Sequence, residues 1–264
     1  MNDLGELHRL AREIALEAGQ LAALRRAEGV TIAASKATIA DIVTEADREV
    51  EALVRSRIAD ARPGDGFLGE ESGSAESETG LTWVVDPIDG TVNYAFGMPT
   101  YAVSIAVVEG SDPAAWQSLV GVVYAPALDE LFEATLGGGA WLKGERLRVG
   151  TDVSAGALIS TGFGYDPASH ESDLALVHQM MPLARDLRRL GAASIDLSYV
   201  AMGRLDAYVE RGLKPWDYAA GALIVTEAGG QIGWHAPDEA GRPMIVAGGP
   251  AIFDTLYERT TPAS

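Results

Sequence analysis

The 264-residue chain contains no cysteine and only four histidines. The absence of thiols excludes disulfide bonds, thiolate catalysis and cysteine-ligated zinc. The histidines are scattered along the chain and show no spacing typical of metal ligands: His8, His170, His178 and His235. Any metal site in this protein would therefore be built from oxygen ligands.

Basic residues are also scarce, because 20 Lys and Arg face 38 Asp and Glu, which gives a net charge of −18. Such acidity argues against nucleic acid or an anionic membrane as a partner. It would also repel a phosphate ester unless cations are bound locally. No apolar run reaches membrane-spanning length, and the acidic N-terminus lacks a signal-peptide pattern. We therefore expect a cytoplasmic protein.

The stretch over residues 83–94 is the most informative part of the sequence. It opens with aromatic and β-branched residues that predict a buried strand, and Pro87, which has no backbone N–H, predicts the end of that strand. Asp86 and Asp89 stand three residues apart across a tight turn. Two carboxylates about 4 Å apart repel by roughly 4 kcal/mol at an effective dielectric of 20. A hard cation, Mg²⁺ first and Mn²⁺ second, would turn that repulsion into a binding site.

The residues that follow add an anion-binding feature. Gly90 lets the backbone pass close to a ligand, and Thr91 offers a hydroxyl and an N–H. If a helix begins here, its free N–H groups form an anion site beside the metal. An Asp-Pro and Asp-Gly surface turn is an equally ordinary interpretation of this stretch. Taken alone, the stretch leaves both interpretations open.

Secondary-structure patterns divide the chain near residue 150. The first part reads as helices over 3–28 and 44–61 and then strands over 82–85, 100–108, 118–124, 131–135 and 140–149. The second part reads as strands over 157–161, 205–210, 231–234 and 244–247 and helices over 170–187, 195–202, 216–228 and 251–259. We expect layered α+β or α/β architecture, with an α+β lobe over 1–150 and an α/β lobe over 151–264 that share an interface.

Every other acidic candidate has an ordinary structural explanation. Thr44 and Asp47 form a capping-box pattern, and Asp217 is suited to cap the helix that begins near it. Glu70 ends a short apolar piece before an acidic loop, and Glu210 ends a strand. Lys36 and Asp41 read as solvated loop residues.

Together, however, these segments resemble the inositol monophosphatase family of Mg²⁺-dependent, lithium-sensitive phosphomonoesterases. The resemblance covers residues 10 to 255, approximately, and the family's marks stand in the family's order. They are Lys36 with Asp41-Ile-Val-Thr-Glu-Ala-Asp47, Gly69-Glu70-Glu71-Ser72, Asp86-Pro-Ile-Asp-Gly-Thr91, Gly191-Ala-Ala193 with Glu210, and Trp216-Asp217-Tyr-Ala-Ala-Gly221.

The resemblance implies a fold like that of inositol monophosphatase and fructose-1,6-bisphosphatase, with alternating helix and sheet layers, an active site between the lobes and a homodimer. It also implies a role for each site residue. Glu70, Asp86 and the Ile88 carbonyl would hold one Mg²⁺; Asp86, Asp89 and Asp217 would hold a second, and a third, weaker ion would lie near Glu70. Gly90 and Thr91 would bind the phosphate; Glu70 and Thr91, with Asp47 behind Thr91, would orient and deprotonate water; Gly191, Ala192, Ala193, Glu210 and Asp217 would contact the substrate.

Two departures leave the substrate open. Ala192 stands where the family often has Ser or Thr, and the segment 212–215 differs from the animal enzymes. Inositol 1-phosphate is the first hypothesis; histidinol phosphate, fructose 1,6-bisphosphate and 3′-phosphoadenosine 5′-phosphate are alternatives. A non-catalytic regulator that binds sugar phosphates predicts the loss of a ligand, yet every expected ligand is present. A calcium-binding structural protein would need one compact acidic loop, and these acids come from four separated segments.

Overall fold

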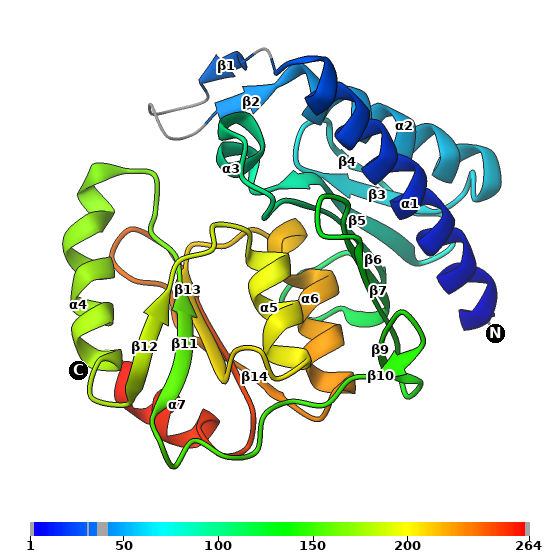
Figure 1. Cartoon of the computed structure of the whole chain (residues 1–264). Coiled ribbons are helices and arrows are strands. Elements are labelled where there is room, and N and C mark those ends of the chain that lie inside the picture. Colours follow the sequence, from blue (N-terminus) through cyan, green and yellow to red (C-terminus); the bar gives the residue numbers. More distant parts are fainter. Residues whose placement is uncertain (1–2, 31, 36–41, 262–264) are drawn as a thin grey trace.

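The computed structural model describes residues 3–30, 32–35 and 42–261 (Figure 1). Lys36 and Asp41, which the family resemblance includes, lie outside the described residues. The helices are α1 (Leu4–Glu28), α2 (Glu45–Ala61), α3 (Thr91–Phe96), α4 (His170–Met180), α5 (Ala193–Ala201), α6 (Pro215–Glu227) and α7 (Phe253–Thr260), with a 3-10 turn at Pro167–Ser169. Among the described helices, none combines the length and apolarity needed to cross a membrane.

The strands form a large sheet, a smaller sheet and one separate pair. The pair is β1 (Ile32–Ser35) with β2 (Ile42–Thr44). The large sheet contains β3 (Gly66–Gly69), β4 (Gly73–Ala75), β5 (Leu81–Asp89), β6 (Ala102–Glu109), β7 (Gln117–Ala125), β8 (Glu130–Thr135), β9 (Gly139–Leu142) and β10 (Glu145–Arg146), in the order β10-β9-β8-β7-β6-β5-β3-β4. The smaller sheet contains β11 (Ala157–Thr161), β12 (Ala184–Arg188), β13 (Ala207–Arg211), β14 (Gln231–His235) and β15 (Met244–Gly248), in the order β12-β11-β13-β15-β14.

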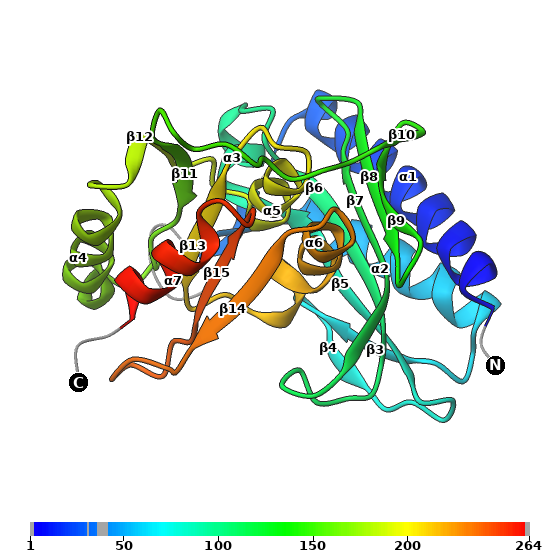
Figure 2. The ribbon, with the colours of Figure 1, turned by 90° about the horizontal axis from the view of Figure 1, so that it is seen from below.

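Helices and sheets alternate through the molecule. Helices α1 and α2 cover the outer face of the large sheet, α5 and α6 lie between the two sheets, and α4 and α7 cover the outer face of the smaller sheet (Figures 1 and 2). Strand β5 is buried on both faces, since Trp83 and Val85 pack toward α1 and α2 while Val84 packs toward α5 and α6. The expected alternating layers are confirmed. The division into lobes at residue 150 stays a prediction, because α5 and α6 pack directly on strands of the large sheet.

The first two helices begin where local chemistry predicts. Asp3 accepts hydrogen bonds from the N–H groups of Gly5 and Glu6 at 2.9 and 3.3 Å and thereby caps α1. Thr44 and Asp47 form the expected capping box at the start of α2. The sequence predictions for both helices are confirmed.

The predicted helix over 170–187 is wrong in its second half. Helix α4 ends at Met180, and residues 184–188 form strand β12 at the edge of the smaller sheet. Pro182 contributes to the break, because it has no N–H for a helical hydrogen bond.

Strand β5 does not end at Pro87 as predicted. It continues to Asp89, and its pairing with β6 changes register between Asp86 and Asp89. A bulge of this kind leaves a position where no ladder N–H is needed, so a proline is tolerated there. The bulge lies near the end of β5 and is flanked by two acidic residues, Asp86 and Asp89. The strand predicted over 140–149 is likewise interrupted, by a turn at Lys143 and Gly144 in which both residues have positive φ.

Glycine allows α6 to lie close to the large sheet. A Cβ atom on Gly121 of β7 would lie 2.7 Å from the carbonyl oxygen of Ala220 in α6. Gly121→Ala is therefore expected to lower the free energy of unfolding by about 1–3 kcal/mol, measured by urea denaturation. Gly64→Ala is the control, since its new Cβ would first meet the movable end of the Thr79 side chain at 3.2 Å. Equal losses in the two variants would contradict close backbone packing as the cause.

Candidate active site

A cavity of about 850 Å³ gathers nearly all of the predicted site residues. It lies where the end of β5 meets the start of α3, the N-terminal ends of α5 and α6 and the end of β13. Asp47 is the exception and lies behind Thr91. The predicted residues that line the cavity are Glu70, Asp86, Ile88, Asp89, Gly90, Thr91, Gly191, Ala192, Ala193, Glu210 and Asp217. The fold therefore assembles one site from segments far apart in the chain.

The two carboxylates of the β5 bulge are buried and held by neighbouring donors. Asp86 is only 2% exposed, and its Oδ1 accepts the N–H of Ile88 at 3.0 Å. Asp89 accepts the N–H groups of Ala193 and Ser194 at 3.2 and 2.7 Å and the Ser194 hydroxyl at 2.5 Å. The first turn of α5 thus fixes Asp89. The sequence analysis did not predict Ser194. The one sequence feature that could have indicated it is its position directly after the Gly191-Ala-Ala193 segment.

Two further acids approach from other elements. Asp217 in the first turn of α6 accepts the N–H of Lys214 at 2.6 Å through Oδ2, which confirms its predicted capping role. Its Oδ1, like Oδ2 of Asp86, accepts no hydrogen bond within the described residues. Glu70 follows β3, and its N–H donates to the Val85 carbonyl at 3.3 Å, which ties this segment to β5. Capping therefore leaves carboxylate oxygens available for a ligand.

Negative charge accumulates in this part of the cavity. Burial raises the pKa of Asp86 well above its ordinary value, and repulsion from Glu70 and Asp89 raises it further. Burial and repulsion also raise the pKa of Asp217, while for Asp89 the hydrogen bonds from α5 partly offset the rise in pKa caused by burial. An all-oxygen donor set with this excess of negative charge fits the hard cations Mg²⁺ and Mn²⁺.

The carboxylates that line the cavity do not lie close enough together to form a metal-binding cluster. No three Asp, Glu or His side chains of the described residues form a ready-made cation site. The hydrogen bonds described above hold the carboxylates of Asp86, Asp89 and Asp217 on nearby backbone donors.

Thr91 links the cavity to a buried carboxylate. Its Oγ1 lies 3.1 Å from Oδ1 of Asp47 and 3.1 Å from the Ile88 carbonyl oxygen, so it can donate its single proton to either acceptor. The other oxygen of Asp47, Oδ2, accepts the N–H and the hydroxyl of Thr44 at 2.8 and 2.5 Å. Capping of α2 and support of Thr91 are therefore performed by different oxygens of one carboxylate.

Gly90 is required by the geometry of the turn before α3. Its φ is +87°, and a Cβ atom there would lie 2.9 Å from the Thr100 carbonyl oxygen and 3.1 Å from the Ala192 Cβ. Glycine therefore allows the chain to turn tightly between β5 and α3, where Gly90 and Thr91 line the cavity.

Glu210, in β13, also lines the cavity. The Tyr208 hydroxyl donates a hydrogen bond to its carboxylate, and burial raises the pKa of Glu210 to about 7. A Cβ on Gly162 would overlap this carboxylate, so glycine at 162 makes room for it. Sequence analysis missed this support, and it also missed other residues of the wall: Phe163, Gly164, Tyr165, Asp166, Ser169, Arg189, Arg211 and Arg242. Arg189 and Arg211 had a signal, because Arg189 stands beside the Gly191 segment and Arg211 follows Glu210.

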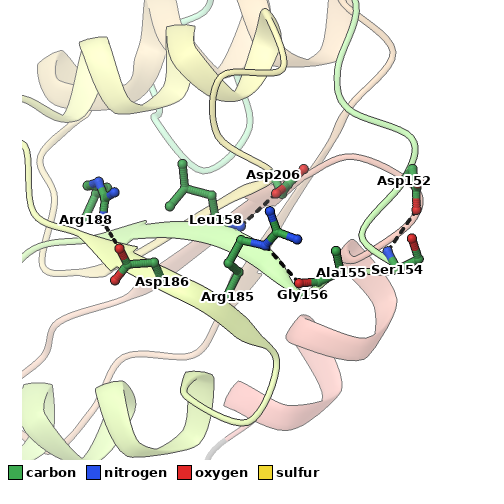
Figure 3. A pocket seen from close by; sticks show the side chains of 9 residues that line it. All are labelled: Asp152, Ser154, Ala155, Gly156, Leu158, Arg185, Asp186, Arg188 and Asp206. Carbon is green, nitrogen blue, oxygen red and sulfur yellow. Dashed lines mark hydrogen bonds and ion pairs between the residues drawn. The ribbon is translucent and has the colours of Figure 1, made fainter.

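A second cavity, of about 440 Å³, lies at the β11 and β12 edge of the smaller sheet (Figure 3). Its charged groups already have partners: Arg188 pairs with Asp186 at 2.6 Å, and Arg185 donates to the Ala155 carbonyl at 2.9 Å. Asp206 accepts the N–H of Leu158 at 2.7 Å. This cavity brings together none of the predicted site residues.

Comparisons with known proteins agree with the fold. Residues 3–244 match the Inositol monophosphatase family. Inositol-1-monophosphatase SuhB of Mycobacterium tuberculosis is 41% identical over 275 residues, which cover 97% of this chain and 93% of that protein. Nus factor SuhB of Escherichia coli K12 is 39% identical over 256 residues, covering 94% of this chain and 92% of that protein.

Among solved structures, the extragenic suppressor protein suhB from Bartonella henselae superposes with a TM-score of 0.86 at 32% sequence identity. The superposition covers 98% of this chain and 100% of the Bartonella henselae chain. The shared layers and the match over nearly the whole sequence define the class as that of the inositol monophosphatase-like proteins. This chain belongs to the inositol monophosphatase family.

Proposed function

We propose that the chain hydrolyses phosphate monoesters with Mg²⁺ and that myo-inositol 1-phosphate is its substrate. The observation that carries this proposal is the single cavity that unites Glu70, Asp86, Asp89 and Asp217 with the Thr91–Asp47 pair. Family membership supports phosphatase chemistry. A homodimer and inhibition by Li⁺ belong to the same proposal.

The acidic residues divide into two sets of cation ligands in this proposal. Glu70, Asp86 and the Ile88 carbonyl would hold one ion; Asp86, Asp89 and Asp217 would hold the second, with a third, weaker ion near Glu70. Mn²⁺ is a substitute for Mg²⁺. When bound, such cations lower the pKa of water and stabilise negative charge on phosphate and on the leaving oxygen.

The remaining steps fall to the chain itself. The N–H groups of Gly90 and Thr91 would orient the phosphate. If Thr91 Oγ1 donates its proton to Asp47, its lone pairs can accept a hydrogen bond from water in the cavity. Glu70, on the same cavity wall, would remove the proton from that water. Gly191, Ala192, Ala193 and Glu210 would contact the alcohol, with Glu210 accepting hydrogen bonds from adjacent ring hydroxyls.

The competing interpretation is that the chain is a non-catalytic regulator. The name of one relative, Nus factor SuhB, points to this alternative. A regulator would not need the complete acidic set, whereas this cavity contains every predicted ligand. Phosphate release from inositol 1-phosphate, histidinol phosphate, fructose 1,6-bisphosphate and 3′-phosphoadenosine 5′-phosphate should be measured with Mg²⁺ and with EDTA. We expect phosphate release to require Mg²⁺ and to be fastest for inositol 1-phosphate. No release from any ester would refute the proposal.

Glu210 is expected to decide between substrates. Losing a charge-assisted hydrogen bond costs about 1.5–3 kcal/mol, so Glu210→Gln should lower kcat/KM for inositol 1-phosphate by roughly ten- to a hundredfold. The small ester p-nitrophenyl phosphate, which has no ring hydroxyls, should be hydrolysed at nearly the wild-type rate. Equal losses on both esters would assign Glu210 to the metal site or to the fold instead.

A further inference from the structure

Glu51 is an acidic residue buried on the side of α2 that faces the large sheet. It is 2% exposed, and the apolar side chains of Val50 and Val54 beside it are fully buried. A carboxylate removed from water is costly unless hydrogen bonds compensate for its lost hydration. Glu51 lies beyond the first turn of α2, so it does not cap the free N–H groups of that helix. Its burial therefore needs another explanation.

That explanation lies in the turn between β3 and β4, residues 70–72. Oε2 of Glu51 accepts the N–H of Glu71 at 2.9 Å, and Oε1 accepts the N–H of Ser72 at 2.6 Å. Gly69 permits this approach, because a Cβ atom there would lie 2.5 Å from Oε2 of Glu51. One buried carboxylate thus binds two consecutive backbone N–H groups, and hydrogen bonds to an ionised acceptor are stronger than neutral ones.

The bonds to Glu51 fix the backbone directly after Glu70. The N–H of Glu70 itself donates to the Val85 carbonyl at 3.3 Å. Strand β4, into which the turn leads, is only three residues long, exposed, and at the edge of the sheet. Three consecutive N–H groups therefore tie the turn to β5 and α2, and Glu51 accepts two of them.

Helix α2 also supports the Thr91 side of the cavity. Asp47 stands four residues before Glu51, so the two carboxylates lie one turn apart on the same face of α2. Oδ1 of Asp47 lies 3.1 Å from Oγ1 of Thr91. Two buried acids of one helix thus contact the two turns that carry Thr91 and Glu70. Helix α2 is a common frame for both turns.

We propose that Glu51 is a positioning residue of the active site, which acts through the backbone of residues 70–72. It places the Glu70 carboxylate where that group can bind a cation and accept a proton from water. This inference rests on the proposed function, which assigns both roles to Glu70. Groups that hold metal ligands by hydrogen bonds typically contribute roughly 10–100-fold to metal affinity or activity.

Magnesium binding without substrate tests the proposal. Glu51→Gln keeps the shape of the side chain, but its amide NH₂ group would face one of the two N–H groups, donor against donor. The dissociation constant of Mg²⁺, measured by calorimetry, should rise about tenfold.

Asp65→Asn is the matched control for Glu51→Gln. Asp65 directly precedes β3, whereas Glu70 directly follows it, and its carboxylate accepts the Nε1–H of Trp83 at 2.9 Å. This variant also weakens a carboxylate that holds neighbouring segments together, but at the opposite end of the strand. It should leave the dissociation constant of Mg²⁺ unchanged.

Hydrogen exchange and a pair of esters locate the effect. The N–H groups of Glu71 and Ser72 should exchange faster in Glu51→Gln than in the wild type or Asp65→Asn. At a fixed, subsaturating Mg²⁺ concentration, release from inositol 1-phosphate and from p-nitrophenyl phosphate should fall by the same factor of about ten. Glu70 acts at the phosphate end, which both esters share, so this equal loss separates the effect of Glu51 from that of Glu210.

The outcomes distinguish this inference from the proposed function. An unchanged Mg²⁺ dissociation constant in folded Glu51→Gln would overturn the inference alone, because Glu51 would then serve only the stability of the turn. A wild type that binds Mg²⁺ but releases no phosphate would refute the proposed function, while weaker binding by Glu51→Gln would still support the positioning role. A wild type that binds no Mg²⁺ would refute both. If Glu51→Gln fails to fold, Glu51→Asp replaces it in every assay, because its shorter side chain cannot reach both N–H groups.

Discussion

Asp86→Asn is expected to abolish phosphate release at saturating Mg²⁺, with a loss of at least ~10³-fold, while the protein stays folded. Asp86 is proposed to contribute to both cation sites, and bound cations supply several kcal/mol of charge stabilisation in such reactions. Asparagine has the same shape but lacks the charge. Because Asp86 is 2% exposed and is repelled by its acidic neighbours, the neutral variant should be at least as stable as the wild type in EDTA.

Melting temperature provides a second readout for Asp86. Mg²⁺ should raise the melting temperature of the wild type, because a ligand that binds only the folded state stabilises it, and should raise that of Asp86→Asn much less. Asp129→Asn removes the same charge from an exposed ion pair with Lys143 and should behave as wild type. More than a tenth of wild-type activity in Asp86→Asn would refute the shared-ligand role.

Local chemistry explains why much of this site could be predicted from the sequence. The capping box of Thr44 and Asp47, the capping carboxylate of Asp217 and the glycine turn at Gly90 each depend on residues close together in the chain. Family resemblance then joined these separate segments into one site, and the structure places them around one cavity. Their catalytic roles remain predictions for the experiments above.

Features that depend on distant pairing could not be predicted in this way. The bond between Asp89 and Ser194 joins residues 105 positions apart. The bulge at Pro87 follows from pairing with β6, which overrides the local tendency of proline to end a strand.

The end of α4 is a different kind of error, since the signal was present in the sequence. Pro182 stands two residues after Met180, where the helix ends, and the apolar residues on both sides of it gave the appearance of one continuous helix. Strand β12 then forms because it can pair with β11 in parallel. At this position the proline interrupts the helix although the apolar pattern continues past it.

Thr91→Val should lower kcat by about 10²–10⁴-fold with little change in KM, which is the usual effect of removing a positioned proton-transfer group. Valine keeps the shape of threonine but cannot link water in the cavity to Oδ1 of Asp47. Steady-state kinetics with inositol 1-phosphate would measure the loss. The melting temperature should fall little, because Thr91 is only partly buried and Asp47 keeps its bonds to Thr44.

Thr44→Val is the matched control, because it removes a hydroxyl from the other oxygen of the same carboxylate, Oδ2 of Asp47. Loss of this cap should cost about 0.5–2 kcal/mol of stability and leave kcat within a few-fold of wild type. The two variants thus separate the two oxygens of Asp47. If Thr91→Val kept its kcat and lost only stability, Asp47 would serve helix α2 alone, and the activation of water would have to rest on Glu70.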